Sequence, residues 1–88
     1  MTVFFPNKSR NFNKAKEQVS FIGHDDLSEV EFRVDIAALI KIDADVAQDE
    51  HGYLTVFDKA RPAIERVARR AYMRKKGRMI LLTASDIH

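Results

Sequence analysis

The 88-residue sequence predicts one small α+β domain that spans residues 1–88. Two segments in the first half alternate apolar and polar residues, as half-buried antiparallel strands do. A long segment in the second half repeats apolar residues at helical spacing, and a short apolar run follows it. The order is therefore strand–strand–helix–helix–strand. A small antiparallel sheet with both helices packed on one face is the simplest layered arrangement of these elements.

A β-hairpin is predicted for the first half of the chain. Apolar and polar residues alternate over 18–22 and, more clearly, over 29–34, so each strand has one face suited to burial. The turn-forming residues 23–28 are expected to connect the two strands. Residues 3–5 are expected to form a further short strand, which Pro6 ends because proline cannot donate to a strand ladder.

Two helices are expected between the hairpin and the C-terminal strand. Asp35 is predicted to cap a short helix over 36–42, its carboxylate accepting backbone N–H groups of the first turn. A long helix is expected from about residue 49 to 75, kinked or broken just before Pro62 because an internal proline removes a hydrogen bond. The apolar residues 79–83 predict a third strand of the sheet, either central or covered by helices.

Short motifs spread over nearly the whole chain resemble one known family. They are Phe5-Pro6, Phe12-Asn13, Gly23-His24-Asp25, Glu31-Phe32-x-Val34 and Phe57-x-x-x-Arg61-x-x-Ile64-x-x-x-Ala68-x-x-x-Tyr72. In order and spacing they resemble the YrdB-like family of small bacterial proteins, a domain of unknown function. The resemblance implies a compact α+β fold and a cytoplasmic bacterial setting. It implies no activity, cofactor or catalytic residue.

Composition excludes several classes of protein. The chain has no cysteine, which rules out disulfides, a thiolate nucleophile and iron–sulfur clusters. No apolar run approaches the roughly 18 residues of a membrane helix, so we expect no membrane segment. The N-terminus lacks the pattern of a secretory signal, and with no cysteines this favours a cytoplasmic location.

The sequence also gives no sign of catalysis. It has no glycine-rich phosphate loop, no serine elbow and no pair of histidines one helical turn apart. Nothing in the pattern places two carboxylates in a shared apolar pocket. We therefore expect a protein that is not an enzyme, with no cofactor and no small-molecule substrate.

Charge is distributed unevenly, although the net charge is only +2. Residues 17–50 carry ten acids against two bases, and residues 61–78 carry eight bases against one acid. Such a layout fits an anionic partner, head-to-tail self-association or neutralisation within the molecule. On the long helix the basic side chains are expected to form a solvated face able to contact the phosphates of a nucleic acid: Arg66, Arg69, Arg70, Arg74, Lys75 and Lys76.

Two charged clusters allow more than one interpretation. The basic face could simply be solvated, with Glu65 paired to Arg69 one turn further along the helix. His24 and Asp25 form a candidate for a small anion or metal site, although the favoured interpretation is a hairpin turn whose aspartate bonds its own backbone.

Arg61 is expected to have a hydrogen-bond or ion-pair partner within the protein. It lies at the edge of the apolar stripe of the long helix, and a half-buried guanidinium needs a carboxylate or carbonyl groups around it. We predict a fixed bond from Arg61 to an acid near the hairpin or the first helix, such as Asp25 or Asp35. A small anion site is the functional alternative.

The leading hypothesis is a non-enzymatic domain that acts through protein–protein contact, with a homodimer as one form of that contact. An exposed apolar patch or an unpaired sheet edge would be the contact surface. The alternative is an accessory protein that binds nucleic acid through the basic helix at 61–78, and a small anion or metal site near His24 ranks third.

Overall fold

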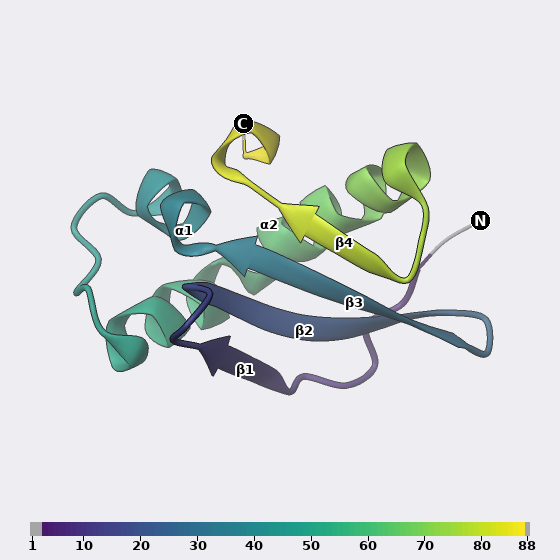
Figure 1. Cartoon of the computed structure of the whole chain (residues 1–88), viewed down its shortest axis with the longest axis horizontal. Coiled ribbons are helices and arrows are strands. Elements are labelled where there is room, and N and C mark those ends of the chain that lie inside the picture. Colours follow the sequence, from purple (N-terminus) through teal and green to yellow (C-terminus); the bar gives the residue numbers. More distant parts are fainter. Residues whose placement is uncertain (1–2, 88) are drawn as a thin grey trace.

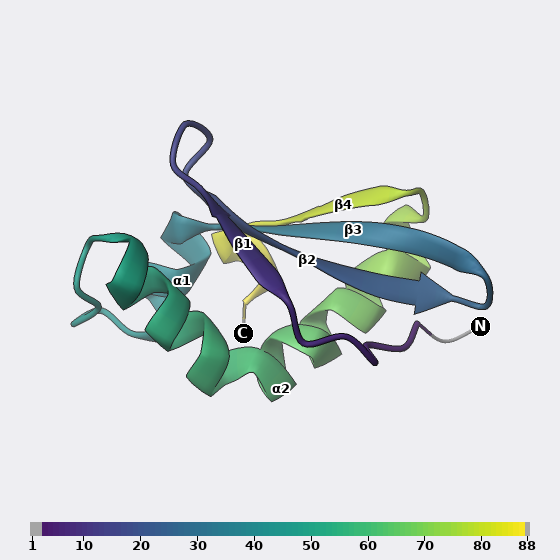
Figure 2. The same ribbon diagram turned by 90° about the horizontal axis from the view of Figure 1, so that it is seen from below.

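The computed structural model of the protein describes residues 3–87, which form a four-stranded sheet with two helices on one of its faces (Figures 1 and 2). In chain order the elements are β1 (Arg10–Asn13), β2 (Gln18–Asp25), β3 (Ser28–Asp35), α1 (Ile36–Ile42), α2 (Glu50–Lys75), β4 (Met79–Leu82) and the 3-10 turn η1 (Ala84–Asp86). The predicted α+β class is confirmed.

The sheet has the order β1-β2-β3-β4, so strands that follow one another in the chain also lie side by side. β1, β2 and β3 run antiparallel, whereas β4 runs parallel to β3. The sheet is therefore mixed, which corrects the expectation of a wholly antiparallel sheet. Two helices connect β3 to β4 and return the chain to the end where β3 begins, as a parallel neighbour requires. β4 lies at an edge, with α2 packed against it.

β1 and the hairpin turn differ from the predictions. β1 lies on the outer side of β2, where even Phe12 is only half-buried, so its polar composition concealed a strand. β2 continues through Gly23, which leaves Asp26 and Leu27 as the turn. A Cβ on Gly23 would lie 2.8 Å from the ring of Phe5, so this strand position needs a glycine.

The N-terminal segment lies along β2 in two pieces. Phe4 forms the expected short strand contact, its backbone N–H and carbonyl each bonded to His24 at 2.8 Å. Further along, Arg10 pairs with Phe21. The chain takes six residue steps from Phe4 to Arg10, whereas β2 takes three between their partners. Residues 6–9 therefore loop out from the sheet, and we call them the N-terminal loop.

The core lies between the sheet and α2. Phe21 and Phe32 stack with 5.4 Å between their ring centroids, and Phe57 of α2 packs on Phe21 at 5.2 Å. Phe5 completes this aromatic cluster, 5.7 Å from Phe21 and 5.5 Å from Phe32. The N-terminal segment thus belongs to the core.

The two helices begin with aspartates that act differently. Asp49 caps α2 by accepting a 2.7 Å hydrogen bond from the backbone N–H of Gly52, so the predicted start of the long helix is confirmed. Asp35 occupies the N-cap position of α1, but its carboxylate accepts from the side-chain amide of Gln18 at 3.0 Å and makes no cap bond. The predicted carboxylate cap is wrong because the strand register places Gln18 opposite Asp35.

α2 runs from Glu50 to Lys75 without a break, so a break before Pro62, one of the two predicted alternatives, is not found. Proline removes one N–H from the helix ladder, but Phe57 and Ile64 on either side of it are buried. This tertiary packing keeps both halves helical. Figure 2 shows the helix bending as it passes beneath the sheet. Neither α2 nor any other helix within the described residues is long and apolar enough to cross a membrane.

Candidate interaction surface

One face of the sheet carries no helix in the part of the chain that the structure describes. Figure 2 shows α1 and α2 on the opposite side, and Figure 1 looks onto the uncovered side. Burial alternates along β2 and β3, because every second side chain points into the core. The side chains that point away define what we call the open sheet face: Phe4, Ser20, Ile22, His24, Glu29, Glu31, Arg33, Met79 and Leu81.

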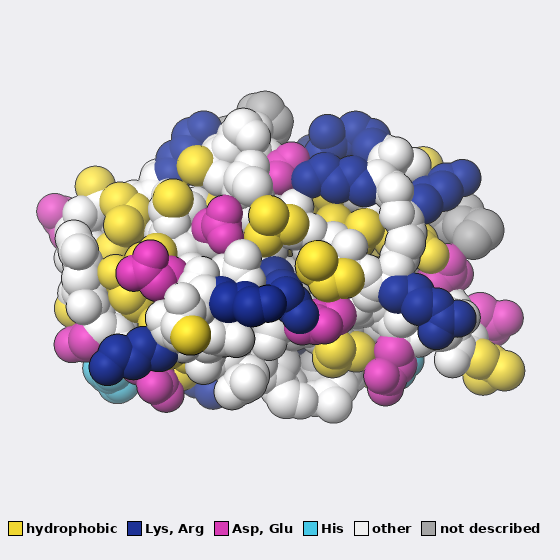
Figure 3. All heavy atoms as spheres, viewed as in Figure 1, with side chains coloured by type: hydrophobic (Ala, Val, Ile, Leu, Met, Phe, Trp, Pro, Cys, Tyr) yellow, Lys and Arg dark blue, Asp and Glu magenta, His cyan; other side chains and the backbone are white. Residues whose placement is uncertain are grey.

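An ion pair lies in the middle of this face. Glu31 and Arg33 of β3 are 2.9 Å apart, measured between Oε2 and Nε. The strand register places Ile22 and Met79 on either side of Glu31, and Leu81 beside Arg33. Figure 3 shows basic and acidic side chains near the middle of this face with apolar side chains around them. Apolar side chains therefore flank Glu31 on both sides, whereas Arg33 lies between Leu81 and the polar Ser20.

Exposed apolar side chains are concentrated on this side of the molecule. Phe4 is 61% exposed and Met79 48% exposed on the open sheet face, while Leu27 is 95% exposed at the turn between β2 and β3. Among the large apolar side chains exposed within residues 3–87, Met73 on α2 lies elsewhere. Gathered apolar side chains mark a binding surface, whereas scattered ones do not. The open sheet face therefore exposes large apolar side chains, which makes it a candidate binding surface.

The two edges of the sheet suit a partner less well. β1 and β4 are each four residues long, and β1 is polar. At the outer edge of β4, the carbonyl of Leu81 accepts a 2.9 Å hydrogen bond from Nζ of Lys75. A lysine at an exposed edge discourages pairing with another strand. The open sheet face is therefore the better candidate.

The structure divides the predicted basic face of α2. Arg66 and Arg70 are exposed, as expected. Arg69 is not part of a solvated face: its Nε donates to the carbonyl of Val3 at 3.1 Å, and its guanidinium lies 5.2 Å from the ring centroid of Phe5. Arg69 therefore holds the N-terminal segment against the helix, a role that the sequence did not indicate.

Two more of the predicted basic residues form ion pairs with Asp86. Its carboxylate lies 3.2 Å from Nη2 of Arg74 and 3.6 Å from Nζ of Lys75. It also accepts a 2.8 Å hydrogen bond from the backbone N–H of Thr83. Burial acts to raise the pKa of Asp86, but the Thr83 bond and the two cations lower it overall. Sequence reasoning missed Asp86, although the Thr83-x-x-Asp86 spacing is that of a capping box. Lys76 remains exposed.

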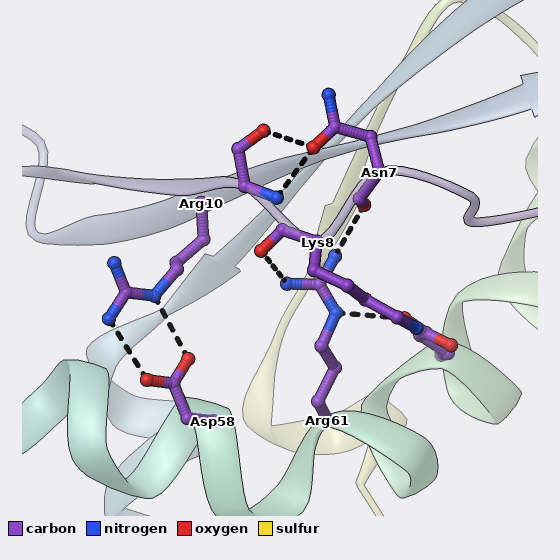
Figure 4. Close-up of polar contacts among 7 residues, drawn as sticks. Asn7, Lys8, Arg10, Asp58 and Arg61 are labelled. Carbon is purple, nitrogen blue, oxygen red and sulfur yellow. Dashed lines mark hydrogen bonds and ion pairs between the residues drawn. The ribbon is translucent and has the colours of Figure 1, made fainter.

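Arg61 is buried, with 7% of its surface exposed, and joins α2 to the N-terminal loop (Figure 4). Its Nε donates to Oε2 of Glu65 at 2.8 Å. Its Nη1 donates to the carbonyl of Lys8 at 2.9 Å, and its Nη2 to the carbonyl of Asn7 at 3.2 Å. Nζ of Lys8 returns to Glu65 at 3.3 Å, so the loop and the helix are held by one connected set of bonds.

The predicted acidic partners of Arg61 are wrong, although it does have the expected carboxylate and carbonyl partners. Asp25 and Asp35 do not bond to it, because Glu65 lies one helical turn away on the same side of α2. Glu65 is turned toward Arg61, so its expected pairing with Arg69 does not form. Because Asn7 and Lys8 supply backbone carbonyls, only the three-dimensional structure reveals them as partners.

The surroundings of Arg61 favour a structural role over anion binding. Its guanidinium lies 5.5 Å from the ring centroid of Phe21 and 5.3 Å from that of Phe57. Beside it, Arg10 makes two 2.9 Å hydrogen bonds to Asp58, which lower the pKa of that carboxyl. Figure 4 shows both arginines directed at partners within the protein. A buried guanidinium bonded in this way offers no open face to an anion.

His24 and Asp25 make other contacts than those expected of a metal site. The hydroxyl of Tyr72 on α2 donates to the carboxylate of Asp25, and this bond raises the pKa of Tyr72. The backbone of His24 pairs with Phe4. Within residues 3–87 no group of three or more His, Cys, Asp or Glu side chains is placed to hold a metal ion. Asp25 therefore serves here to join β2 to α2.

Together these features define a small α+β domain that packs its helices on one face of a mixed sheet and leaves the other face open. The chain belongs to the family described as Protein of unknown function (DUF1488), whose model matches residues 3–82. This match confirms the predicted membership of a family of unknown function, and it extends from the N-terminal segment through β4. No curated protein and no solved structure matches the chain.

Proposed function

We propose that the protein is a non-enzymatic cytoplasmic domain that binds another protein through the open sheet face. One observation carries the proposal: the helix-free side exposes Phe4 and Met79, and apolar side chains of β2 and β4 flank the Glu31–Arg33 ion pair. Covering Phe4 and Met79 would contribute about 1 kcal/mol each. The ion pair would favour a partner with complementary polar groups at the centre of the contact.

Nucleic-acid binding by the basic segment at 61–78 is the less favoured function. Four basic side chains in this segment contact the protein itself: Arg61, Arg69, Arg74 and Lys75. Each such contact reduces the charge available to phosphates, on which nucleic-acid affinity chiefly depends. Arg66, Arg70, Lys76 and Arg78 stay exposed, so nucleic-acid binding is kept as a separate outcome of the experiment.

Capture of partners from a native lysate, with and without nuclease treatment, tests the proposal with two matched variants. Met79→Lys puts a charge on the open sheet face next to Glu31, which can pair with it, so the fold is kept. Met73→Lys makes the same change on α2, at a methionine that is 64% exposed. We expect Met79→Lys to reduce capture of a protein partner at least tenfold, equivalent to about 1.4 kcal/mol, and Met73→Lys to leave it unchanged.

Three results would contradict the proposal. Equal capture by both variants would show that the open sheet face is not used. Loss of all partners on nuclease treatment would favour the nucleic-acid alternative. Capture of no protein by the unaltered chain would remove the interaction hypothesis itself. Melting temperatures of both variants serve as the control for folding.

A further inference from the structure

A groove of about 500 Å³ lies where α1, the start of α2 and the turn between β1 and β2 meet. Its floor is apolar and consists of Phe12, Ile36, Ile40 and Tyr53. The groove lies on no part of the open sheet face, so it is a separate candidate for recognition. Its chemistry is that of an apolar slot with a charged rim.

The walls of the groove are held in place by contacts within the protein. Phe12 and Tyr53 stack with 5.8 Å between ring centroids, which ties β1 to α2. The backbone N–H of Ile36 donates to the carbonyl of Glu17 at 3.1 Å, which ties α1 to the turn. A groove that is already formed requires little ordering when something binds in it.

The rim of the groove is predominantly acidic. Glu17, Asp49 and Glu50 line it together with the single base Lys14. A ligand that matches both the floor and the rim therefore has an apolar side chain flanked by cationic groups. Such a combination occurs on the surface of this same chain.

The solvent side of α2 carries the complementary pattern. Met73 is 64% exposed. Arg70 lies three residues before Met73, and Arg66 lies four residues before Arg70, so all three lie on one side of the helix. Within residues 3–87 neither Arg66 nor Arg70 forms an ion pair with a carboxylate. Methionine adapts to irregular apolar slots because its side chain is unbranched and flexible.

The groove and Met73 cannot meet within one molecule. The groove includes Glu50 at the first residue of α2, whereas Met73 lies two residues before its last. At 1.5 Å per residue they are roughly 35 Å apart, close to the 36 Å length of the whole molecule. If α2 supplies the complement, it can therefore come only from a second copy.

We infer that a second copy of this chain docks the Met73 side of its α2 into the groove, head to tail. Met73 contacts the apolar floor, and Arg66 and Arg70 of that copy face Glu17 and Glu50. The contact is heterologous, so it leaves one free groove and one free helix face at the two ends of an assembly. It is independent of the proposed function, because it does not use the open sheet face.

Light scattering at low salt tests this inference with two charge-reversed variants. The groove variant is Glu17→Lys/Glu50→Lys, and the helix variant is Arg66→Glu/Arg70→Glu. We expect the mass of the unaltered protein to rise with concentration, an effect that high salt weakens. Each variant alone stays monomeric. A mixture of the two forms a one-to-one dimer and nothing larger, because only one intact groove and one intact helix face remain.

Several outcomes would overturn the inference. They are an unaltered protein that stays monomeric at every concentration, variants that associate like the unaltered protein, and a mixture that stays monomeric although both variants melt normally. A Met73→Ser variant, which changes no charge, provides a second route and is expected to weaken association. Met79→Lys is expected to associate normally, so failure here is distinguishable from failure of the proposed function.

Discussion

At the scale of single residues, Arg61 determines how the N-terminal loop lies on the helix. Its guanidinium contacts Glu65, two backbone carbonyls and two aromatic rings. The sequence could indicate that such a residue needs polar partners, because a buried charge without them is costly. It could not indicate the partners themselves, because Asn7 and Lys8 contribute backbone atoms that carry no pattern in the sequence.

Removing the Arg61 side chain should destabilise the fold strongly. We expect Arg61→Met to lower the free energy of unfolding by about 3 kcal/mol, because it leaves the buried Glu65 and the two carbonyls without their donor. Urea unfolding measures this directly. The double change Arg61→Met/Glu65→Met should recover part of the loss, since no charge is then left alone. A loss below about 0.5 kcal/mol for the single variant, the level of an ordinary surface change, would show that the anchor is unimportant.

At the scale of elements, a local sequence pattern predicts the structural features that depend only on residues close together in the chain. The alternation in β3, the apolar stripe of α2 and the start of α2 near residue 49 are local features, and each is confirmed. β1 is not predicted, because its polar sequence carries no strand pattern and its pairing with β2 is what makes it a strand. The parallel direction of β4 also escapes prediction, because it depends on where two helices return the chain. Contacts between distant segments decide each of these differences.

The C-terminal end of α2 is joined to η1 through Asp86, and this contact should depend on pH. The folded pKa of Asp86 lies below its ordinary value. Its contribution is therefore fully present above the ordinary aspartate pKa of about 4 and is lost as the pH falls through the folded value. We expect Asp86→Asn to lower stability by about 1 kcal/mol at neutral pH.

Thermal melting of Asp86→Asn and the unaltered protein from neutral to strongly acidic pH checks this prediction. The difference in melting temperature between the two proteins should shrink as the pH drops, because the carboxyl of the unaltered protein then becomes neutral as well. Asp45→Asn, the same change at an exposed position, is the control and should follow the unaltered protein. A difference that keeps the same size at every pH would contradict the assigned cause.

At the scale of the whole molecule, the two proposed recognition surfaces lie on different sides and use different residues. The sequence predicts an exposed apolar patch or an unpaired sheet edge as the contact surface, and its uneven charge fits an anionic partner, head-to-tail contact or neutralisation within the molecule. It could not indicate the members of the open sheet face, because Met79 and Leu81 join Glu31 and Arg33 only through the pairing of β4 with β3. Nor could it show that Arg69 is withdrawn from the basic face by Val3.

Oxidative footprinting of the native complex tests the central claim most directly, since Met79 and Met73 report on the two surfaces separately. The complex is diluted until the chain no longer self-associates, and the oxidation of each methionine is compared with that in the free protein. We predict that Met79 is protected by the bound partner while Met73 oxidises as it does in the free chain. Unchanged oxidation of Met79 in a complex that remains intact would contradict the assignment of the open sheet face as the binding surface.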